Sequence, residues 1–266
     1  MKILFSTGCL FHLPLAEIFR LAAEAGFDGC DLVVNRDFND PRYEETVRAA
    51  LAILPAHALH VPFMKVKRWG TQEQAVVRCV ELAKKLGIRV VNFHPPSWFH
   101  MEIQFFRWFR KVGDFQRELR CEDVFLTIEN MPLSGRRLKL APYVLNRFED
   151  LIDFAIARNL YFTFDTTHLG TFDSDVVAAF LRFLKTGRLK NIHLSDCAPP
   201  DQHLFYGRGK LPIARLLNTA RVMGYDGMVT VELAPAELPT TREWLSKVLS
   251  YACSFVRLHA GEAKGG

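Results

Sequence analysis

The sequence lacks several features that would place it in a common protein class. It has no run of about 18 apolar residues, so no membrane span is expected. No G-x-G-x-x-G motif follows the first apolar segment, which argues against a dinucleotide-binding fold. The six cysteines lie far apart without a C-x-x-C pair, so neither a disulfide scaffold nor a cysteine-ligated zinc site is indicated. These absences favour a protein of the reducing cytoplasm.

Charge and composition set wider limits. The 34 lysines and arginines exceed the 29 aspartates and glutamates by 5, a mild surplus that suits a phosphorylated substrate or nucleic acid but requires neither. With 266 residues, of which 49% are hydrophobic, the chain is long enough for one sizeable core. We predict one domain over residues 1–260 and a short polar tail over residues 261–266.

Hydrophobic periodicity predicts alternating strands and helices. Short apolar runs, typical of buried parallel strands, occur at Ile3–Ser6, Gly29–Val33, Ala58–Pro62, Arg89–Pro95, Val124–Asn130, Tyr161–Thr166, Leu189–Asp196 and Met228–Leu233. Between them lie segments with apolar residues every three or four positions, such as Gln72–Leu86, Phe148–Arg158, Val176–Leu184 and Ile213–Met223. Eight such units in this length predict a single closed (β/α)8 TIM barrel.

Side chains that can bind metal occur at or near the carboxyl ends of six predicted strands: His60, His94, Glu129, Asp165, His193 and Glu232. In a barrel those ends share one mouth, where barrel enzymes keep their sites. One such residue alone is as often a structural hydrogen-bonding group, but six ionisable groups together would be costly without a counter-ion. Oxygen and imidazole ligands predict a divalent metal, with zinc or manganese ahead of magnesium or cobalt. Three loop residues extend the cluster: His168, Asp201 and His203.

The motifs around these residues resemble the xylose isomerase-like TIM barrel superfamily. They are, in chain order, Leu-His-Val-Pro-Phe (59–63), Asn-Phe-His-Pro (92–95), Thr-Ile-Glu-Asn (127–130), Phe-Asp-Thr-Thr-His (164–168), Ile-His-Leu-Ser-Asp (192–196), Asp-Gln-His (201–203), Gly-Arg-Gly (207–209), Gly-Tyr-Asp-Gly (224–227) and Thr-Val-Glu-Leu (230–233). The resemblance covers nearly the whole chain. The superfamily contains sugar and sugar-phosphate isomerases and epimerases, inosose dehydratases, and the endonuclease IV family of DNA repair enzymes.

The isomerase and epimerase branch implies one metal ion. Its ligands in this chain would be Glu129, Asp165, His193 and Glu232, with His168 contacting the substrate. A metal that chelates a sugar carbonyl and the adjacent hydroxyl acidifies the neighbouring C–H bond, and two carboxylates can remove and return its proton. Glu129 and Glu232 suit these two roles. Arg208 is a candidate for binding a substrate hydroxyl or phosphate, although an exposed loop arginine is at least as often a surface charge.

The endonuclease IV branch implies three zinc ions. Their ligands would be His60, His94 and Glu129 for one, Glu129, Asp165, His193 and Glu232 for another, and His168, Asp201 and His203 for the third. A metal-bridging hydroxide would then attack a phosphodiester beside an abasic site in DNA. All nine ligand positions are filled in this chain, so the sequence leaves one to three ions per chain and two substrate classes open.

Three segments depart from the repair enzymes. Those enzymes usually carry a histidine-containing, glycine-rich segment after strand one, a tyrosine after the His-x-Pro of strand three, and Asp-Thr-Cys-His on strand six. This chain instead has Ser-Thr-Gly-Cys-Leu-Phe at residues 6–11, Phe63, and Thr167. The departures favour a metal-dependent isomerase or epimerase of a small sugar, sugar phosphate or polyol. A barrel that binds a sugar or metal without turnover is the third alternative.

Two aromatic segments allow more than one role. In the basic stretch over residues 63–69, Trp69 is a candidate for stacking on a substrate or a nucleic-acid base, whereas a solvated loop with one lid aromatic is the favoured interpretation. The region after strand four is dense in aromatic residues, namely Phe99, Phe105, Phe106, Trp108 and Phe109. This region predicts a hydrophobic lid or a contact with a second copy in a homo-oligomer.

Overall fold

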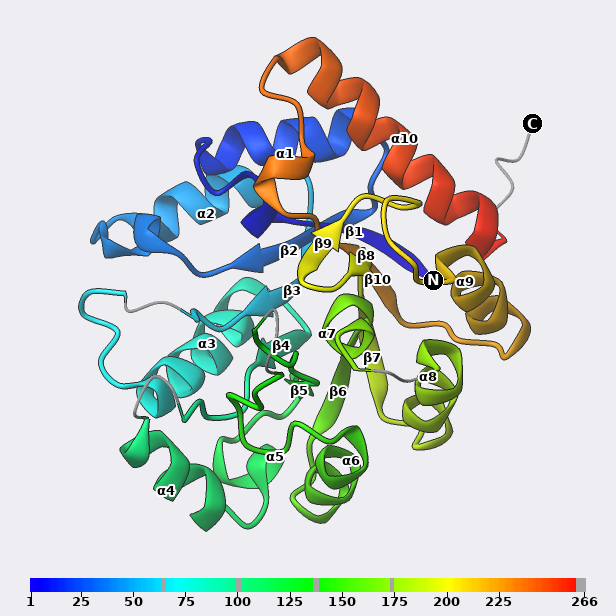
Figure 1. The fold of residues 1–266 in the computed structure, drawn as a ribbon. Helices are drawn as coiled ribbons and strands as arrows, with labels where there is room; N and C mark the ends of the chain where they lie inside the picture. The colour runs from blue at the N-terminus through cyan, green and yellow to red at the C-terminus, as the bar shows by residue number, and fades with distance from the viewer. Residues whose placement is uncertain (64–65, 99–101, 136–138, 173–174, 262–266) are drawn as a thin grey trace.

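Eight parallel strands close into a barrel, as the sequence predicts. A computed structural model describes residues 1–63, 66–98, 102–135, 139–172 and 175–261. The strands neighbour one another in the order β1-β10-β7-β6-β5-β4-β3-β2, and β2 pairs with β1 to close the ring (Figure 1). Their bounds are β1 (Lys2–Ser6), β2 (Gly29–Val33), β3 (Ala56–His60), β4 (Val90–Phe93), β5 (Phe125–Glu129), β6 (Tyr161–Asp165), β7 (Leu189–Leu194) and β10 (Met228–Val231). An antiparallel hairpin of β8 (Asp196–Ala198) and β9 (Asp201–Leu204) follows β7.

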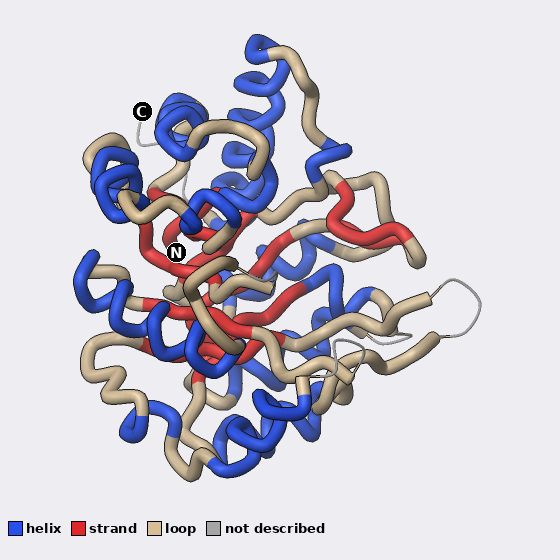
Figure 2. Tube along the Cα trace, turned by 90° about the vertical axis from the view of Figure 1, so that its left-hand side faces the viewer, coloured by secondary structure: helices blue, strands red, loops and turns tan. Residues whose placement is uncertain are grey.

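Helices lie around the strands, which run through the middle of the molecule (Figures 1 and 2). They are α1 (Leu15–Glu24), α2 (Tyr43–Leu51), α3 (Gln72–Leu86), α4 (Ile103–Lys111), α5 (Phe115–Glu118), α6 (Phe148–Ala157), α7 (Thr166–Gly170), α8 (Val176–Lys185), α9 (Ile213–Val222) and α10 (Arg242–Ala260), with 3-10 turns at Thr7–Leu10, Arg36–Asn39 and Pro235–Glu237. Within the described ranges, no helix combines the length and the apolar character that crossing a bilayer requires.

Local sequence signals set the element bounds. The side chain of Gln74 accepts a hydrogen bond from the backbone N–H of Thr71 at 3.0 Å and so supports the start of α3. Gly87 ends this helix with φ of 72°, a left-handed conformation that glycine adopts without a steric cost. The predicted helix Gln72–Leu86 is therefore confirmed at both ends. β3 begins at Ala56, earlier than predicted, and stops before Pro62, which has no N–H for the ladder.

Strand alternation separates the barrel interior from the outer core. In β6, Phe162 and Phe164 join the main hydrophobic core, and their ring centroids lie 5.1 Å and 5.2 Å from that of Phe183 on α8. The alternate residues Thr163 and Asp165 are fully buried but belong to no hydrophobic cluster. Successive side chains of a strand point to opposite faces, so this pattern places polar groups inside the barrel.

The barrel interior holds a hydrogen-bonded polar layer beneath the strand-end residues. Its members come from six strands: Asp31, Asn92, Thr127, Thr163, Asn191 and Thr230. Oγ1 of Thr127 lies 2.9 Å from Oγ1 of Thr163 and 3.2 Å from Oδ1 of Asn92. Between β10 and β7, Oγ1 of Thr230 lies 3.0 Å from Oδ1 of Asn191. These contacts satisfy groups that would otherwise be costly to bury.

The aromatic helix after β4 is part of the core. Phe105 and Phe109 on α4 are 2% and 1% exposed, and the ring of Phe109 stacks 4.5 Å from that of Phe154 on α6. The molecule itself covers this face of α4. Phe105 and Phe109 are therefore unavailable for a lid or for a second copy, and the expectation is wrong for these two residues. Phe106 and Trp108 are half-buried against the same core, and Phe99 lies outside the described residues.

Phe109→Ala should lower the free energy of unfolding by about 3–5 kcal/mol, because it removes a packed ring and leaves a cavity. Urea denaturation followed by circular dichroism measures this change. Ile103→Ala is the control on the same helix: its side chain is 53% exposed, and its loss should change stability by less than about 0.5 kcal/mol. Equal effects of the two substitutions would contradict the burial of this face of α4.

Candidate metal centre

The predicted ligands converge at the carboxyl end of the barrel. His60, Glu129 and Asp165 end β3, β5 and β6, whereas His94 and Glu232 directly follow β4 and β10. Together with residues of β7, α7 and β9, they form three groups, in each of which the ligand atoms lie within 4.8 Å of one another. The groups are His60, His94 and Glu129; Glu129, Asp165, His193 and Glu232; and Asp165, His168 and His203. Of the nine predicted ligands, only Asp201 belongs to none of them.

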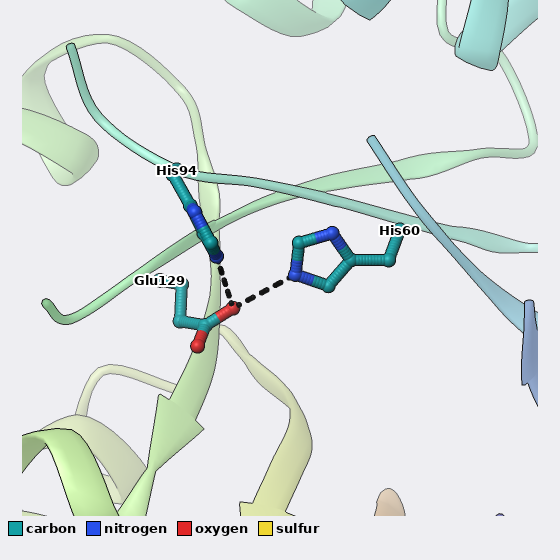
Figure 3. Close-up of side chains that lie close together, drawn as sticks. All are labelled: His60, His94 and Glu129. Carbon is teal, nitrogen blue, oxygen red and sulfur yellow. Dashed lines mark ion pairs between the residues drawn. The ribbon is translucent and has the colours of Figure 1, made fainter. Parts of the chain in front are cut away.

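The first group meets at one carboxylate oxygen of Glu129 (Figure 3). Nε2 of His60 and Nε2 of His94 each lie 3.4 Å from Oε2 of Glu129. Nδ1 of His60 lies 2.7 Å from the carbonyl oxygen of Val61, which can only accept a hydrogen bond. In the neutral ring Nδ1 therefore carries the proton, and Nε2 offers its lone pair to the centre. Asn92 donates a hydrogen bond to the same oxygen of Glu129 from the polar layer.

The second group surrounds Nδ1 of His193. This nitrogen lies 2.8 Å from Oε2 of Glu232, 3.6 Å from Oε2 of Glu129 and 4.0 Å from Oδ2 of Asp165. Despite these distances, Nδ1 of His193 and Oδ2 of Asp165 are buried without a hydrogen-bond partner among the described residues. Buried polar atoms are rarely left unpaired, because losing water without a replacement is costly. The two orphaned atoms therefore mark a place for a ligand.

The third group forms around α7. Oδ1 of Asp165 accepts a hydrogen bond from the backbone N–H of His168 at 2.6 Å and so caps this short helix. Nδ1 of His168 lies 3.0 Å from the carbonyl oxygen of Asn130, which leaves Nε2 free in the neutral ring. His203 comes from β9, and its ring centroid lies 5.3 Å from that of His168.

Asp201 does not complete this group, contrary to expectation. Its side chain is exposed, and Asp165 supplies the carboxylate instead. Residues two apart in a strand normally share a face, so Asp201 and His203 would point the same way. His203 has φ of 54°, a left-handed conformation that non-glycine residues seldom adopt. This backbone turn breaks the alternation and separates the two side chains.

Electrostatics keep two glutamates of the centre ionised. Burial by itself would raise the pKa of Glu129, but the neighbouring His193 and His94 outweigh it and hold this pKa well below its usual range. Burial also acts to raise the pKa of Glu232, yet His193 lowers it to about 2. The pKa of Asp165 is raised by burial, and the two glutamates add to the rise. The charges of these crowded carboxylates thus depend on cationic neighbours.

The donor set fits a divalent metal ion. A cation among Glu129, Asp165 and Glu232 would relieve the repulsion between their charges. It would also satisfy the orphaned atoms of His193 and Asp165. Carboxylate oxygens and imidazole nitrogens are suitable ligands for such ions. The four residues of the second group would hold it, and the other two groups offer further positions.

Two predicted substrate contacts have partners within the chain. Trp69 is 4% exposed, and its ring packs 5.7 Å from that of Phe38 and 6.0 Å from that of Tyr43. Its indole is therefore a core group, and the expectation of stacking on a substrate or a base is not met. Nη1 of Arg208 lies 2.7 Å and 2.8 Å from the two carboxylate oxygens of Glu237. This ion pair connects the loop after β9 to the last 3-10 turn.

Aromatic side chains border the first group. Phe63 is 59% exposed, and its ring centroid lies 6.3 Å from those of His60 and His94. Its plane is within 23° of that of His94. Tyr143 approaches His94 edge-on at 6.2 Å. Apolar walls around a few converging polar groups are typical of small-molecule sites.

Three supporting residues have roles that were not predicted from the sequence. Asn92 donates to Glu129, and Asp31 contacts Nε2 of His193 at 3.1 Å. Asp196 is 1% exposed and accepts four backbone N–H groups, those of Cys197, Gly207, Gly209 and Leu211, at 2.8–2.9 Å. It thereby shapes the loop that carries Arg208. For Asp31, the signal in the sequence was a charged residue inside an apolar strand, which indicates a buried polar partner.

Comparison with known sequences places the chain among barrels of one type. The family described as xylose isomerase-like TIM barrel matches residues 19–248. An uncharacterized protein from Mycobacterium leprae (strain TN) is 25% identical over 289 residues, which cover 96% of this chain and 98% of that protein. A probable endonuclease 4 from Thermotoga petrophila is 30% identical over 159 residues, 53% of either chain.

Solved structures share the fold over nearly the full chain. A D-tagatose 3-epimerase-like protein has a TM-score of 0.68 at 19% identity, covering 98% of this chain and 99% of that one. Endonuclease IV from Thermus thermophilus has a TM-score of 0.64 at 18% identity, covering 99% and 100%. Identities this low establish the fold alone. The fold neighbours thus include both an epimerase-like protein and an endonuclease IV.

A chelator should destabilise the metal-loaded protein, because it leaves three crowded carboxylates without a cation. An ion present at 1,000 times its Kd contributes about 4 kcal/mol to stability, so EDTA should lower the free energy of unfolding by an amount of this order. Urea denaturation with EDTA, and again after metal is restored, measures the effect. Glu129→Gln alters the carboxylate shared by two groups and should lose most of the EDTA response. No EDTA response in the wild type would argue against a metal centre.

Proposed function

Because the chain belongs to the xylose isomerase-like TIM barrel family, we propose that it is a divalent-metal-dependent isomerase or epimerase of a small sugar, sugar phosphate or polyol. The observation that carries this proposal is the pair of ionised glutamates, Glu129 and Glu232, that face Nδ1 of His193 at 3.6 Å and 2.8 Å. They come from β5 and the end of β10, two strands separated by β6 and β7. We expect one zinc or manganese ion per chain, held by the second group.

The two glutamates suit a proton transfer at carbon. A bound ion would polarise the substrate carbonyl and acidify the C–H bond beside it. One glutamate would accept that proton and, now protonated, could return it to the neighbouring carbon in an isomerisation. In an epimerisation, the other glutamate would first take a proton from solvent and then deliver it to the opposite face. The lowered pKa values keep both side chains ionised, which a proton-accepting carboxylate requires. Glu232 is also 22% exposed, whereas Glu129 is 1% exposed, so Glu232 is the more accessible to a substrate.

The surroundings of the centre support a sugar-sized substrate. Phe63 offers an exposed ring beside His60 and His94, as a wall for the apolar face of a sugar. His168 is oriented by the carbonyl of Asn130, and we assign it a contact with a substrate hydroxyl. Arg208 keeps a guanidinium that is largely exposed beyond its contact with Glu237, and it is a second candidate for substrate binding.

An abasic-site endonuclease with three zinc ions is the second candidate. Its support is that the first and third groups each offer three ligand atoms within 4.8 Å, in addition to the second group. Two neighbouring ions are suited to stabilise the attacking and leaving oxygens of a phosphodiester. Against this candidate, Asp201 lies outside the third group and Trp69 is buried. The third group therefore lacks the Asp201 ligand that the endonuclease branch implies, and Trp69 is not available to stack on an unpaired base.

Solvent deuterium should enter a ketose substrate at the carbon next to its carbonyl. A panel of ketoses and ketose phosphates incubated in D2O and followed by NMR measures the exchange. Glu129→Gln and Glu232→Gln should each lower the exchange rate by at least about 100-fold, because they remove the groups that carry the proton. Metal content must be determined for both variants, since the same residues are proposed ligands.

Glu243→Gln supplies the matched control, because it makes the same substitution on the exposed surface of α10. It should exchange deuterium at the wild-type rate. Exchange that persists in both Glu129→Gln and Glu232→Gln would refute the assignment of acid and base. Exchange with no panel member, even in the wild type, would favour a barrel that binds without turnover.

Metal analysis separates the two candidate reactions. Protein purified without chelator should contain close to one zinc or manganese ion per chain if the isomerase or epimerase proposal is correct. Close to three zinc ions, together with incision of a duplex that carries an abasic site, would establish the endonuclease instead. His60→Ala is informative here, because it removes a ligand of the first group only. It should leave the metal content of an isomerase unchanged.

A further inference from the structure

We propose that Asp31 is a positioning residue, which holds the His193 ring so that Nδ1 faces the metal ion. The inference rests on the metal centre proposed above and applies to both candidate reactions. Asp31 belongs to β2, and its carboxylate reaches across the barrel interior to a side chain of β7. Two strands, β1 and β10, lie between β2 and β7 in the ring.

The hydrogen bonds of Asp31 define which nitrogen of His193 carries a proton. Oδ2 of Asp31 lies 3.1 Å from Nε2 of His193, and both side chains are 1% exposed. Nδ2 of Asn191 and Oγ1 of Thr230 donate to the same oxygen at 3.2 Å and 3.4 Å. An oxygen that receives these donors acts as an acceptor, so Nε2 of His193 must donate its N–H to it. The lone pair of the neutral ring is then on Nδ1, among Glu129, Asp165 and Glu232.

The charge of Asp31 also points to this role. Among the described residues, no lysine or arginine forms an ion pair with it, and its Oδ1 is buried without a hydrogen-bond partner. The imidazole of His193 is thus the one ionisable group with which this carboxylate pairs in the described part of the chain. When Nδ1 binds a cation, the N–H at Nε2 becomes more acidic and its hydrogen bond to a carboxylate becomes stronger. A carboxylate behind a metal-bound histidine both orients the ring and increases its basicity as a ligand.

Asp31→Asn tests the inference, because asparagine keeps the size and one acceptor oxygen but removes the charge. Zinc affinity, measured by competition with a chromophoric chelator, should fall about 10–100-fold. Asp28→Asn is the control, since it makes the same substitution three residues earlier, before β2 begins. The carboxylate of Asp28 accepts a hydrogen bond from the backbone N–H of Ile3 at 2.7 Å and pairs with Arg257, away from the strand-end residues. This variant should bind zinc with wild-type affinity, and circular dichroism must show that both variants fold.

A second measurement needs no variant. In zinc-loaded wild-type protein, nitrogen-15 NMR of the histidine rings should find the proton of His193 on Nε2 and zinc on Nδ1. A proton on Nδ1, or unchanged zinc affinity in a folded Asp31→Asn variant, would overturn the inference. If Asp31→Asn does not fold, the NMR result decides alone. Wild-type protein that binds no zinc or manganese would overturn the metal centre itself, whereas wild-type binding with an unaffected Asp31→Asn overturns the positioning role only.

Discussion

Closure of the eight-stranded ladder is the constraint on which the site depends. In a closed parallel barrel all carboxyl ends lie at one rim, so ligands from β3 through β10 become neighbours although they are distant in sequence. The alternation of each strand then decides what faces inward. In β5, Leu126 and Ile128 pack in the hydrophobic core around the barrel, whereas Thr127 and Glu129 are buried in the barrel interior. A register shift of one residue would turn the glutamate away from the centre.

Because like charges are crowded at this centre, the candidate ligands need supporting contacts that hold them in place. Glu129 and Glu232 stay ionised only because histidines surround them. Burial and the two glutamates already raise the pKa of Asp165. Side chains in such a site move apart unless other contacts hold them. Asn92 holds Glu129, Asn130 holds the backbone of Asp165 through two hydrogen bonds, and Val61 orients His60. These contacts therefore maintain positions of the candidate ligands that electrostatics alone would not favour.

The barrel and the convergence of the candidate ligands were predictable because both follow from periodic patterns. Apolar runs of fixed length indicate the strands, and the topology of a barrel then places the strand ends together. Positions that depend on tertiary contacts were not predictable in this way. Trp69 is a core residue because Phe38 and Tyr43 fold over it, and no local pattern shows that. Phe105 and Phe109 resemble a surface patch in the sequence because nothing there indicates that α6 covers α4.

Asp31 and Asp201 show two further limits. Asp31 lies in an apolar run that predicts a strand, and its role is not visible there because its partner lies 162 residues further along the chain. Asp201 and His203 have the spacing of a ligand pair, yet the left-handed backbone of His203 turns the two side chains apart. Spacing predicts a shared face only where the backbone is regular. Irregular backbone at a functional site can be seen only in the structure.

The position of Asp201 also bears on which reaction the barrel supports. Asp201 pairs with Ala198 in the hairpin, and the loop that follows is fixed by the four hydrogen bonds to Asp196 and by the ion pair of Arg208 with Glu237. To complete a third metal site with Asp201, β9 would have to rotate against these contacts. Proton transfer to and from a substrate carbon by Glu129 and Glu232 requires no such movement, because both carboxylates already face His193. The hairpin, more than the ligands shared by both branches, thus favours the chemistry of a sugar isomerase or epimerase.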